Sequence, residues 1–213
     1  MFQSLCLYDE GEEHWPVKLH LGCGGIFLRG YRNVDIDGLD AKTNPATAQA
    51  NSADVRDYYA GLDGDAHHLP VRRLTVVDLT ADIVELPYTP RTVDKILAVQ
   101  VFEHLSPVRA MDALYHWHRI LKVGSPLVMS VPDMAGILDM MDAAQCMYND
   151  SAVADFAFAL RHLRGRRTNH YNSHHAWYTS ETLCELLDFC GFKTTLLPNF
   201  HFYPAIVARA VRQ

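Results

Sequence analysis

The sequence predicts an α/β fold in which a mostly parallel β-sheet is covered by helices. Short apolar strands alternate with helical stretches along most of the chain, which is the pattern of a parallel sheet with helical crossovers. Of the 213 residues, 49% are apolar and 21% are charged, as in ordinary globular domains, so disordered, collagen-like and coiled-coil chains are excluded. This length fits one domain over residues 1–213.

The first two expected strands enclose the most distinctive turn of the sequence. Residues 17–21 form an apolar strand that ends at the sequence GCGG, residues 22–25. A second strand, residues 31–36, carries Asp35 near its end. Residues 38–73 then show no clear period and are rich in small and polar residues, so they are expected to be either a functional insertion or partly helical.

The middle of the chain continues the alternation. Strands are expected at 74–77, 93–99 and 126–131. Before the last of these, the Ser-Pro pair at 106–107 signals the start of an amphipathic helix, and Gly124 marks the turn that ends it.

The C-terminal part departs from this pattern. Residues 135–178 contain two helical stretches and then a polar segment, 164–178, that is rich in His, Arg and Asn. We expect this insertion and residues 38–73 to act as lid elements. The last two strands, 193–197 and 205–210, are expected to close the sheet as an antiparallel pair.

The charge and cysteine content limit the kinds of molecule that the protein is expected to bind and the cellular compartment in which it is expected. The chain has 19 Lys and Arg against 25 Asp and Glu, a net charge of −6, which argues against a basic nucleic-acid-binding surface. Its five cysteines have unrelated spacings, which favours a reducing compartment. The N-terminus does not resemble a secretory signal, and no apolar run approaches the ~20 residues of a membrane helix. A cytoplasmic protein without membrane contact is expected.

The GCGG turn and the acid that follows it predict a nucleotide-type ligand. Glycines let the backbone turn tightly and approach a ligand closely. A dinucleotide fingerprint needs a third glycine and an acid about 20 residues further on. Here Phe27 stands at the third position, and Asp35 follows Gly22 by only 13 residues. A ligand with ribose and adenine but no pyrophosphate fits better, and a glycine turn that binds nothing is the alternative.

Six short motifs occur in order along the chain. They are KLHLGCG at 18–24, GYRNVD at 30–35, DLT at 78–80, FEHL at 102–105, RILK at 119–122 and SVPD at 130–133. Together they resemble class I S-adenosylmethionine-dependent methyltransferases, especially the small type-11-like branch, over residues 17–133 and again over 178–192. The resemblance implies a Rossmann-like, doubly wound, mostly parallel seven-stranded sheet with an antiparallel C-terminal strand and a lid of helices and loops.

The same resemblance implies S-adenosyl-L-methionine as cofactor and assigns residues to it. Gly22, Cys23 and Gly24 are expected under its methionine portion. Asp35 is expected to hydrogen-bond both ribose hydroxyls, which a carboxylate can do with its two oxygens. His20 stands where the class often has an acid that contacts the amino group.

The remaining cofactor contacts are expected from two later strands. Asp78 and Leu79 are expected to meet the adenine, and Gln100, at the end of the fourth strand, to lie near the sulfonium. For the acids, a turn-forming or capping role is the alternative.

His104 is the expected catalytic group. The resemblance places it where class I enzymes have residues that face the transferred methyl, and an imidazole pKa of about 6.5 suits proton removal from an acceptor. The alternative is a structural histidine that hydrogen-bonds a loop carbonyl. Some quinone-type O-methyltransferases hold a metal with a Glu–His pair, but Glu103 and His104 lack the upstream Glu of that arrangement. No metal site is therefore expected.

The polar segment before the last helix is expected to line the acceptor pocket. Its candidate substrate-binding residues are Tyr171, His174, His175 and Tyr178. A metal site and a plain solvated loop are the alternatives, and the HxxxHH spacing does not by itself secure a ligand geometry.

The expected function is methyl transfer from S-adenosylmethionine to an oxygen or nitrogen of a small molecule, such as a sugar or a secondary metabolite. Nucleic acid is disfavoured, because the chain lacks the (N/D)PP(Y/F/W) element of base-amino methylation and no cysteine follows a proline. The alternatives are a non-catalytic methyltransferase-like subunit, which binds the cofactor or a partner protein, and a nicotinamide-dependent enzyme. Nothing in the sequence specifies the oligomeric state.

Overall fold

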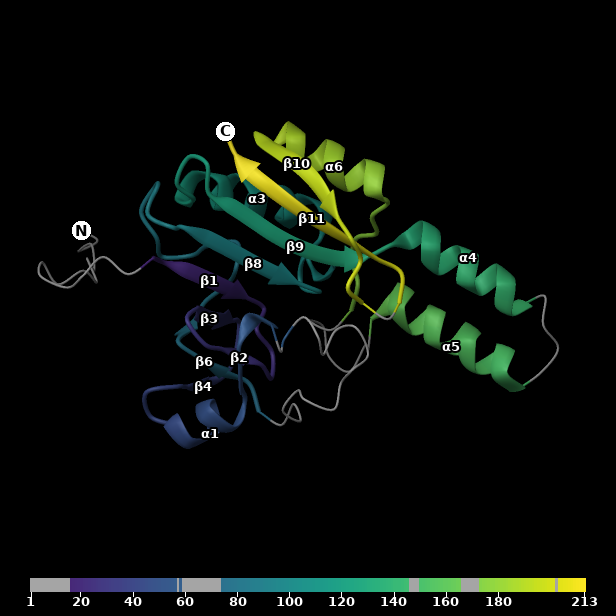
Figure 1. Ribbon diagram of the computed structural model, residues 1–213, viewed down its shortest axis with the longest axis horizontal. Coiled ribbons are helices and arrows are strands. Elements are labelled where there is room, and N and C mark those ends of the chain that lie inside the picture. Colours follow the sequence, from purple (N-terminus) through teal and green to yellow (C-terminus); the bar gives the residue numbers. More distant parts are fainter. Residues whose placement is uncertain (1–15, 57, 59–73, 146–149, 166–172, 202) are drawn as a thin grey trace, which may run out of the picture.

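The centre of the computed structural model is a seven-stranded sheet with strand order β10-β11-β9-β8-β1-β3-β7 (Figure 1). The structure describes residues 16–56, 58, 74–145, 150–165, 173–201 and 203–213. The strands of the sheet are β1 (Lys18–Leu21), β3 (Arg32–Asp35), β7 (Leu79–Thr80), β8 (Lys95–Val99), β9 (Pro126–Pro132), β10 (Phe192–Leu197) and β11 (Ala205–Arg212). Strands β7, β3, β1, β8 and β9 run parallel, and β11 is antiparallel to both β9 and β10. The predicted sheet is confirmed, including its antiparallel end.

The central strands are apolar along their length because both faces of the sheet are covered. All but the first residue of β8 and of β9 are buried, as expected for parallel strands between two layers. On one face, helix α3 (Pro107–Ile120) and helix α6 (Ser180–Phe189) join the larger core, in which Trp117 is fully buried. On the other face, a smaller apolar cluster includes Leu97 and Tyr58.

The third strand of the main sheet lies later in the chain than predicted. Residues 74–77 were expected to form it, but Val76–Val77 (β6) pairs instead with Leu39–Asp40 (β4) in a separate two-stranded sheet. The chain crosses between the two ladders at Asp78, whose N–H donates to the Asn33 carbonyl at 2.8 Å. The edge of the main sheet is therefore β7, two residues further on.

The described part of the first insertion has regular structure. Besides β4, it contains the short helix α1 (Pro45–Ala50) and strand β5 (Ser52–Ala53), which pairs in parallel with β2 (Phe27–Leu28). The rest of the expected lid 38–73, apart from Tyr58, lies outside the described residues.

The second insertion is a helical hairpin. Helix α4 (Met134–Gln145) begins directly after β9 and packs against α5 (Asp150–Arg164), and the two project away from the sheet at the right of Figure 1. A capping box starts α6, in which the Thr179 hydroxyl accepts from the Thr182 N–H while the Thr182 hydroxyl accepts from the Thr179 N–H. No helix in the described ranges is both long and apolar enough to cross a membrane.

Candidate active site

A cavity of about 840 Å³ lies at the carboxyl ends of the central strands. Its lining includes Gly22 after β1, Asp35 at the end of β3 and Gln100 after β8. Side chains from the turn after β8, including the 3₁₀ helix η2 (Phe102–His104), and from helix α5 line it as well. In open parallel sheets, ligands bind at these strand ends, where the direction of strand order changes.

The glycine turn forms one wall of this cavity. Gly22 and Gly24 both have positive φ, 62° and 52°, a backbone conformation that favours glycine. A Cβ at Gly22 would lie 2.6 Å from Cβ of Val101, so the turn can approach the end of β8 only without a side chain. At Gly24 a Cβ would meet no atom within 4 Å. The turn therefore offers bare backbone to the cavity.

Asp35 ties this turn to the end of the second parallel strand. Its Oδ2 accepts a hydrogen bond from the Gly24 N–H at 2.8 Å, and its Oδ1 accepts one from the Ile36 N–H at 2.8 Å. Burial raises the pKa of the carboxyl above its usual value. Each oxygen of a carboxylate can accept a second hydrogen bond, so Asp35 can also serve a pair of ligand hydroxyls.

Gln100 follows the carboxyl end of β8 directly and has a strained backbone conformation. Its φ is 53°, which is uncommon for a residue other than glycine. The conformation is held from β9, where the Ser130 carbonyl accepts from the Gln100 N–H at 2.9 Å and the Ser130 hydroxyl accepts from its amide at 3.3 Å. Such outliers persist where the surroundings enforce them, and they gather at ligand sites.

Two residues expected at the cofactor lie in the interior instead. His20 is fully buried, with Nδ1 3.1 Å from Oδ1 of Asn33 and its ring edge-on to Tyr58. Because successive side chains of a strand point to opposite faces of the sheet, Leu19 and Leu21 lie in the larger core and His20 lies on the other face. The Cys23 side chain is likewise buried, with Sγ 3.7 Å from the Val76 carbonyl, and burial raises the pKa of its thiol.

The two residues expected to meet the adenine, Asp78 and Leu79, lie away from the cavity. The Asp78 carboxylate accepts hydrogen bonds from the N–H and the side-chain amide of Asn33, and neither Asp78 nor Leu79 lines the cavity. Asp82 and Ile83 line it in their place. The cause is the later start of the edge strand, because the first acid after β7 is Asp82. Placing that strand at 79–80 from the sequence would have identified this pair.

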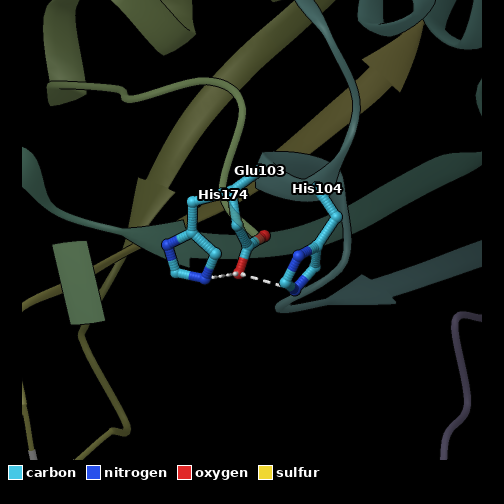
Figure 2. Close-up of side chains that lie close together, drawn as sticks. All are labelled: Glu103, His104 and His174. Carbon is cyan, nitrogen blue, oxygen red and sulfur yellow. Dashed lines mark ion pairs between the residues drawn. The ribbon is translucent and has the colours of Figure 1, made fainter. Parts of the chain in front are cut away.

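Three side chains converge at the other end of the cavity (Figure 2). Nε2 of His104 and Nε2 of His174 both face Oε1 of Glu103, at 3.9 and 3.8 Å. The two imidazole rings meet edge to face with centroids 4.9 Å apart. Glu103 is 1% exposed, while both histidines are partly open to the cavity.

Backbone hydrogen bonds bring His174 to this cluster. The Glu103 carbonyl accepts from the N–H groups of His175 and Ala176 at 2.9 and 3.2 Å. The His174 N–H donates to the Arg164 carbonyl at the end of α5. The segment that begins at Ser173 is thus joined to both η2 and α5.

Burial controls the charge of the cluster. It raises the pKa of Glu103 to about 8. Burial lowers the pKa of His104, and it lowers that of His174 to about 4, with a further contribution from the neighbouring His104. Both imidazoles are therefore neutral at neutral pH.

The other expected substrate residues are divided. His175 lines the cavity, whereas Tyr178 is 7% exposed and stacks on Phe102 in the larger core. Its segment is extended, so side chains alternate, and Trp177 between the buried Ala176 and Tyr178 is exposed. Tyr171 lies outside the described residues.

Sequence reasoning missed several residues that line this end of the cavity. They are Phe158 and His162 of α5, together with Tyr203 before β11. The aromatic rings of His162 and Tyr203 lie 4.1 Å apart between centroids. Only the position of the hairpin relative to the sheet reveals them.

Comparisons with known proteins identify the fold. No protein-family model matches the sequence, and no curated protein matches it. A methyltransferase from Archaeoglobus fulgidus superposes with a TM-score of 0.52 at 13% identity, covering 92% of this chain and 86% of that one. One from Thermotoga maritima gives 0.50 at 16%, covering 98% and 84%. Magnesium protoporphyrin IX methyltransferase from Synechocystis PCC 6803, with S-adenosylhomocysteine bound, gives 0.50 at 14%, covering 93% and 74%. The chain has the fold of the S-adenosylmethionine-dependent class I methyltransferases.

Proposed function

We propose that the protein is an enzyme that transfers a methyl group from S-adenosylmethionine to an oxygen or nitrogen atom of a small molecule. The single observation that carries this proposal is the wall formed by Gly22, Gly24 and Asp35 at the carboxyl ends of β1 and β3. This wall combines bare backbone with a carboxylate that is held in place by the same turn.

The cavity fits the parts of this cofactor better than those of a dinucleotide. Asp35 can accept from the two ribose hydroxyls, and Asp82 and Ile83 can receive the adenine on the neighbouring strand end. Phe27, at the position of the third glycine of a dinucleotide fingerprint, lies in the short strand β2. The turn therefore does not lead into the helix N-terminus on which a pyrophosphate would bind.

The cofactor supplies an electrophilic methyl group on a sulfonium, so alignment of the acceptor accounts for most of the catalysis. Gln100, held by Ser130, lines the same cavity as the glycine wall and the Glu103–His104–His174 cluster, and we assign it to orient the methionine portion. The acceptor then occupies the space against the cluster, His175 and the aromatic residues of α5.

His104 is suited to remove the acceptor's proton. Its Nδ1 lies 2.9 Å from the Ser173 carbonyl oxygen, which can only accept, so Nδ1 carries the hydrogen. Nε2 of the neutral ring then keeps a lone pair, and it faces Glu103. This geometry supports His104 as the general base.

Calorimetry with S-adenosylhomocysteine and with NAD tests the proposal. Binding of S-adenosylhomocysteine with one site per chain, and at least about tenfold tighter than NAD, is the expected result. Absence of S-adenosylhomocysteine binding by the folded protein, or tighter binding of NAD, would overturn it. A screen of small hydroxylated and amino acceptors, read by release of S-adenosylhomocysteine, then separates an enzyme from a non-catalytic binding subunit.

A further inference from the structure

We propose that Glu103, His104 and His174 form a binding site for one divalent transition-metal ion of the Zn²⁺ type at the acceptor end of the cavity. Metal binding stands on the geometry of these three side chains alone. Its role in acceptor binding, given below, rests on the proposed function.

The three donor atoms are spaced for a common ion. Nε2 of His104 and Nε2 of His174 lie 3.9 and 3.8 Å from Oε1 of Glu103, and all three atoms lie within 4.8 Å of one another. A point equidistant from them is about 2.2–2.5 Å from each, compared with about 2.0–2.2 Å for nitrogen and oxygen ligands of zinc. If each of the three donor atoms moved about 0.3 Å toward this point, the distances would match those of a zinc site.

The hydrogen bond that would hold one of the histidine ligands in place is already present. Metal-binding histidines generally donate their other ring N–H to a carbonyl or carboxylate, which holds the ring and its tautomer. Nδ1 of His104 makes this contact with the Ser173 carbonyl oxygen at 2.9 Å. The Ser173–Ala176 segment that provides His174 is itself joined to η2 through the Glu103 carbonyl oxygen.

The carboxylate offers independent support. Glu103 is 1% exposed, and its Oε2 has no hydrogen-bond partner among the described residues. A buried oxygen without a partner is costly, and a cation is the partner that a carboxylate would gain most from. Its other oxygen, Oε1, lies 3.9 and 3.8 Å from the two imidazoles, and no Arg or Lys among the described residues forms an ion pair with it.

The donor set selects the type of ion. Two imidazole nitrogens and one carboxylate oxygen suit Zn²⁺ and its first-row neighbours, whereas Mg²⁺ prefers oxygen ligands and retained waters. Three protein ligands also leave a fourth position open, as in catalytic zinc sites. In the sequence, the Glu103–His104 pair and the histidine-rich segment are separate metal alternatives. The fold joins them, because His174, 70 residues after His104, lies beside Glu103.

In the proposed enzyme, the open position would take an oxygen of the acceptor. A metal ion at this site would lower the pKa of the acceptor's bound hydroxyl. The hydroxyl would then lose its proton to solvent, and its oxygen would attack the methyl group. His104 would be a ligand in that state, because the metal uses the Nε2 lone pair. The inference therefore narrows the acceptor class to hydroxyl compounds.

The test is metal binding by the full chain after treatment with a chelator. Zn²⁺ is titrated by calorimetry, and Co²⁺ is titrated by visible absorption, which reports its coordination geometry. We expect one ion per chain and a tetrahedral Co²⁺ spectrum. His104→Asn keeps a donor for the Ser173 carbonyl but removes Nε2, and His174→Asn and Glu103→Gln remove the other two donors. Each should weaken Zn²⁺ binding at least about 100-fold and abolish the Co²⁺ band.

His118→Gln is the matched control, because His118 lies on α3 against Phe192 and does not line the cavity. It should bind Zn²⁺ as the native chain does. Affinity for S-adenosylhomocysteine, measured without metal, should stay within about threefold in all four variants, which shows that they fold and keeps the two proposals separate. Failure of the native chain to bind Zn²⁺, or equal binding by the three cluster variants, overturns the metal site whatever the result with S-adenosylhomocysteine.

Discussion

The backbone N–H of His175 donates a hydrogen bond of 2.9 Å to the carbonyl oxygen of Glu103. This bond joins the turn after β8 to a segment about seventy residues later in the chain. The Ala176 N–H donates to the same carbonyl oxygen, and the two bonds together place the His174 imidazole beside the Glu103 carboxylate. The Glu103–His104–His174 cluster is therefore complete only when the two parts of the chain have docked.

Gly22→Ala should destabilise the protein and abolish binding of S-adenosylhomocysteine. Alanine at positive φ costs about 1–2 kcal/mol, and the contact with Val101 adds about 1–3 kcal/mol of overpacking. Gly124→Ala is the control, since Gly124 has a φ of 79° but no atom within 4 Å of its Cβ position. Thermal unfolding and calorimetry measure both effects, and equal melting temperatures of the two variants would show that the close approach to Val101 is unimportant.

Asp35→Ala should weaken binding of S-adenosylhomocysteine by roughly 2–3 kcal/mol, because charged hydrogen bonds to the ribose are lost. The carboxylate also accepts from Gly24 and Ile36, so the variant should lose about 1–3 kcal/mol of unfolding free energy as well. Asp37→Ala removes the same charge from an exposed neighbour and should change neither quantity. Calorimetry and denaturant unfolding are the measurements. Similar affinities in the two variants would remove Asp35 from the binding site.

His104→Asn should lower kcat by about 10²–10⁴-fold with the true acceptor while leaving cofactor affinity unchanged. The amide can still donate to the Ser173 carbonyl, so a merely structural histidine would be replaced without loss. Steady-state kinetics after an acceptor screen give kcat and KM separately. A variant with wild-type kcat would assign His104 to holding the Ser173 segment.

Acid should destabilise the protein through His201, which is 5% exposed and lies with Nε2 3.0 Å from the Ser130 hydroxyl. Burial, with a contribution from His162, lowers its pKa to about 4. The unfolded chain binds a proton near pH 6.5 and the native chain only near pH 4, so stability falls as the pH drops between these values, by up to about 3 kcal/mol.

His201→Gln isolates this contribution from those of the other buried histidines. Its unfolding free energy, measured by denaturant titration at several pH values, should fall less steeply than that of the native chain between pH 6.5 and 4. Parallel curves would contradict the assignment to His201.

The parts of the fold that could be predicted depend on short, continuous stretches of sequence. The run of buried residues in β8 and β9 and the GCGG turn are visible as short stretches of sequence, and so is the acid at the end of β3. The edge strand was misplaced because residues 76–77 and 79–80 both pair as strands, in two different sheets. Only the hydrogen bonds of Asp78 with Asn33 decide between them.

The candidate site was predicted less completely, because much of it depends on contacts between distant segments. His104 was expected at the site from the family resemblance, and its role there stays a prediction. Its relation to His174 depends on the docking of the Ser173–Ala176 segment, which the sequence does not show. The same segment explains Tyr178, whose ring enters the core because an extended chain alternates its side chains. His20 is a further case, since the polar partner that allows its burial is Asn33 on the adjacent strand.

The helical hairpin has a consequence for how such a protein can diversify. It is one uninterrupted stretch of chain that leaves the sheet after β9, and its second helix lines the cavity, whereas the glycine wall belongs to β1 and β3. Recombination could exchange the whole hairpin for another of similar length without altering β1, β3 and β7, the strands of the sheet that come first along the chain. In the proposed enzyme, such an exchange would change the acceptor preference and leave the part of the cavity that we assign to the cofactor unaltered.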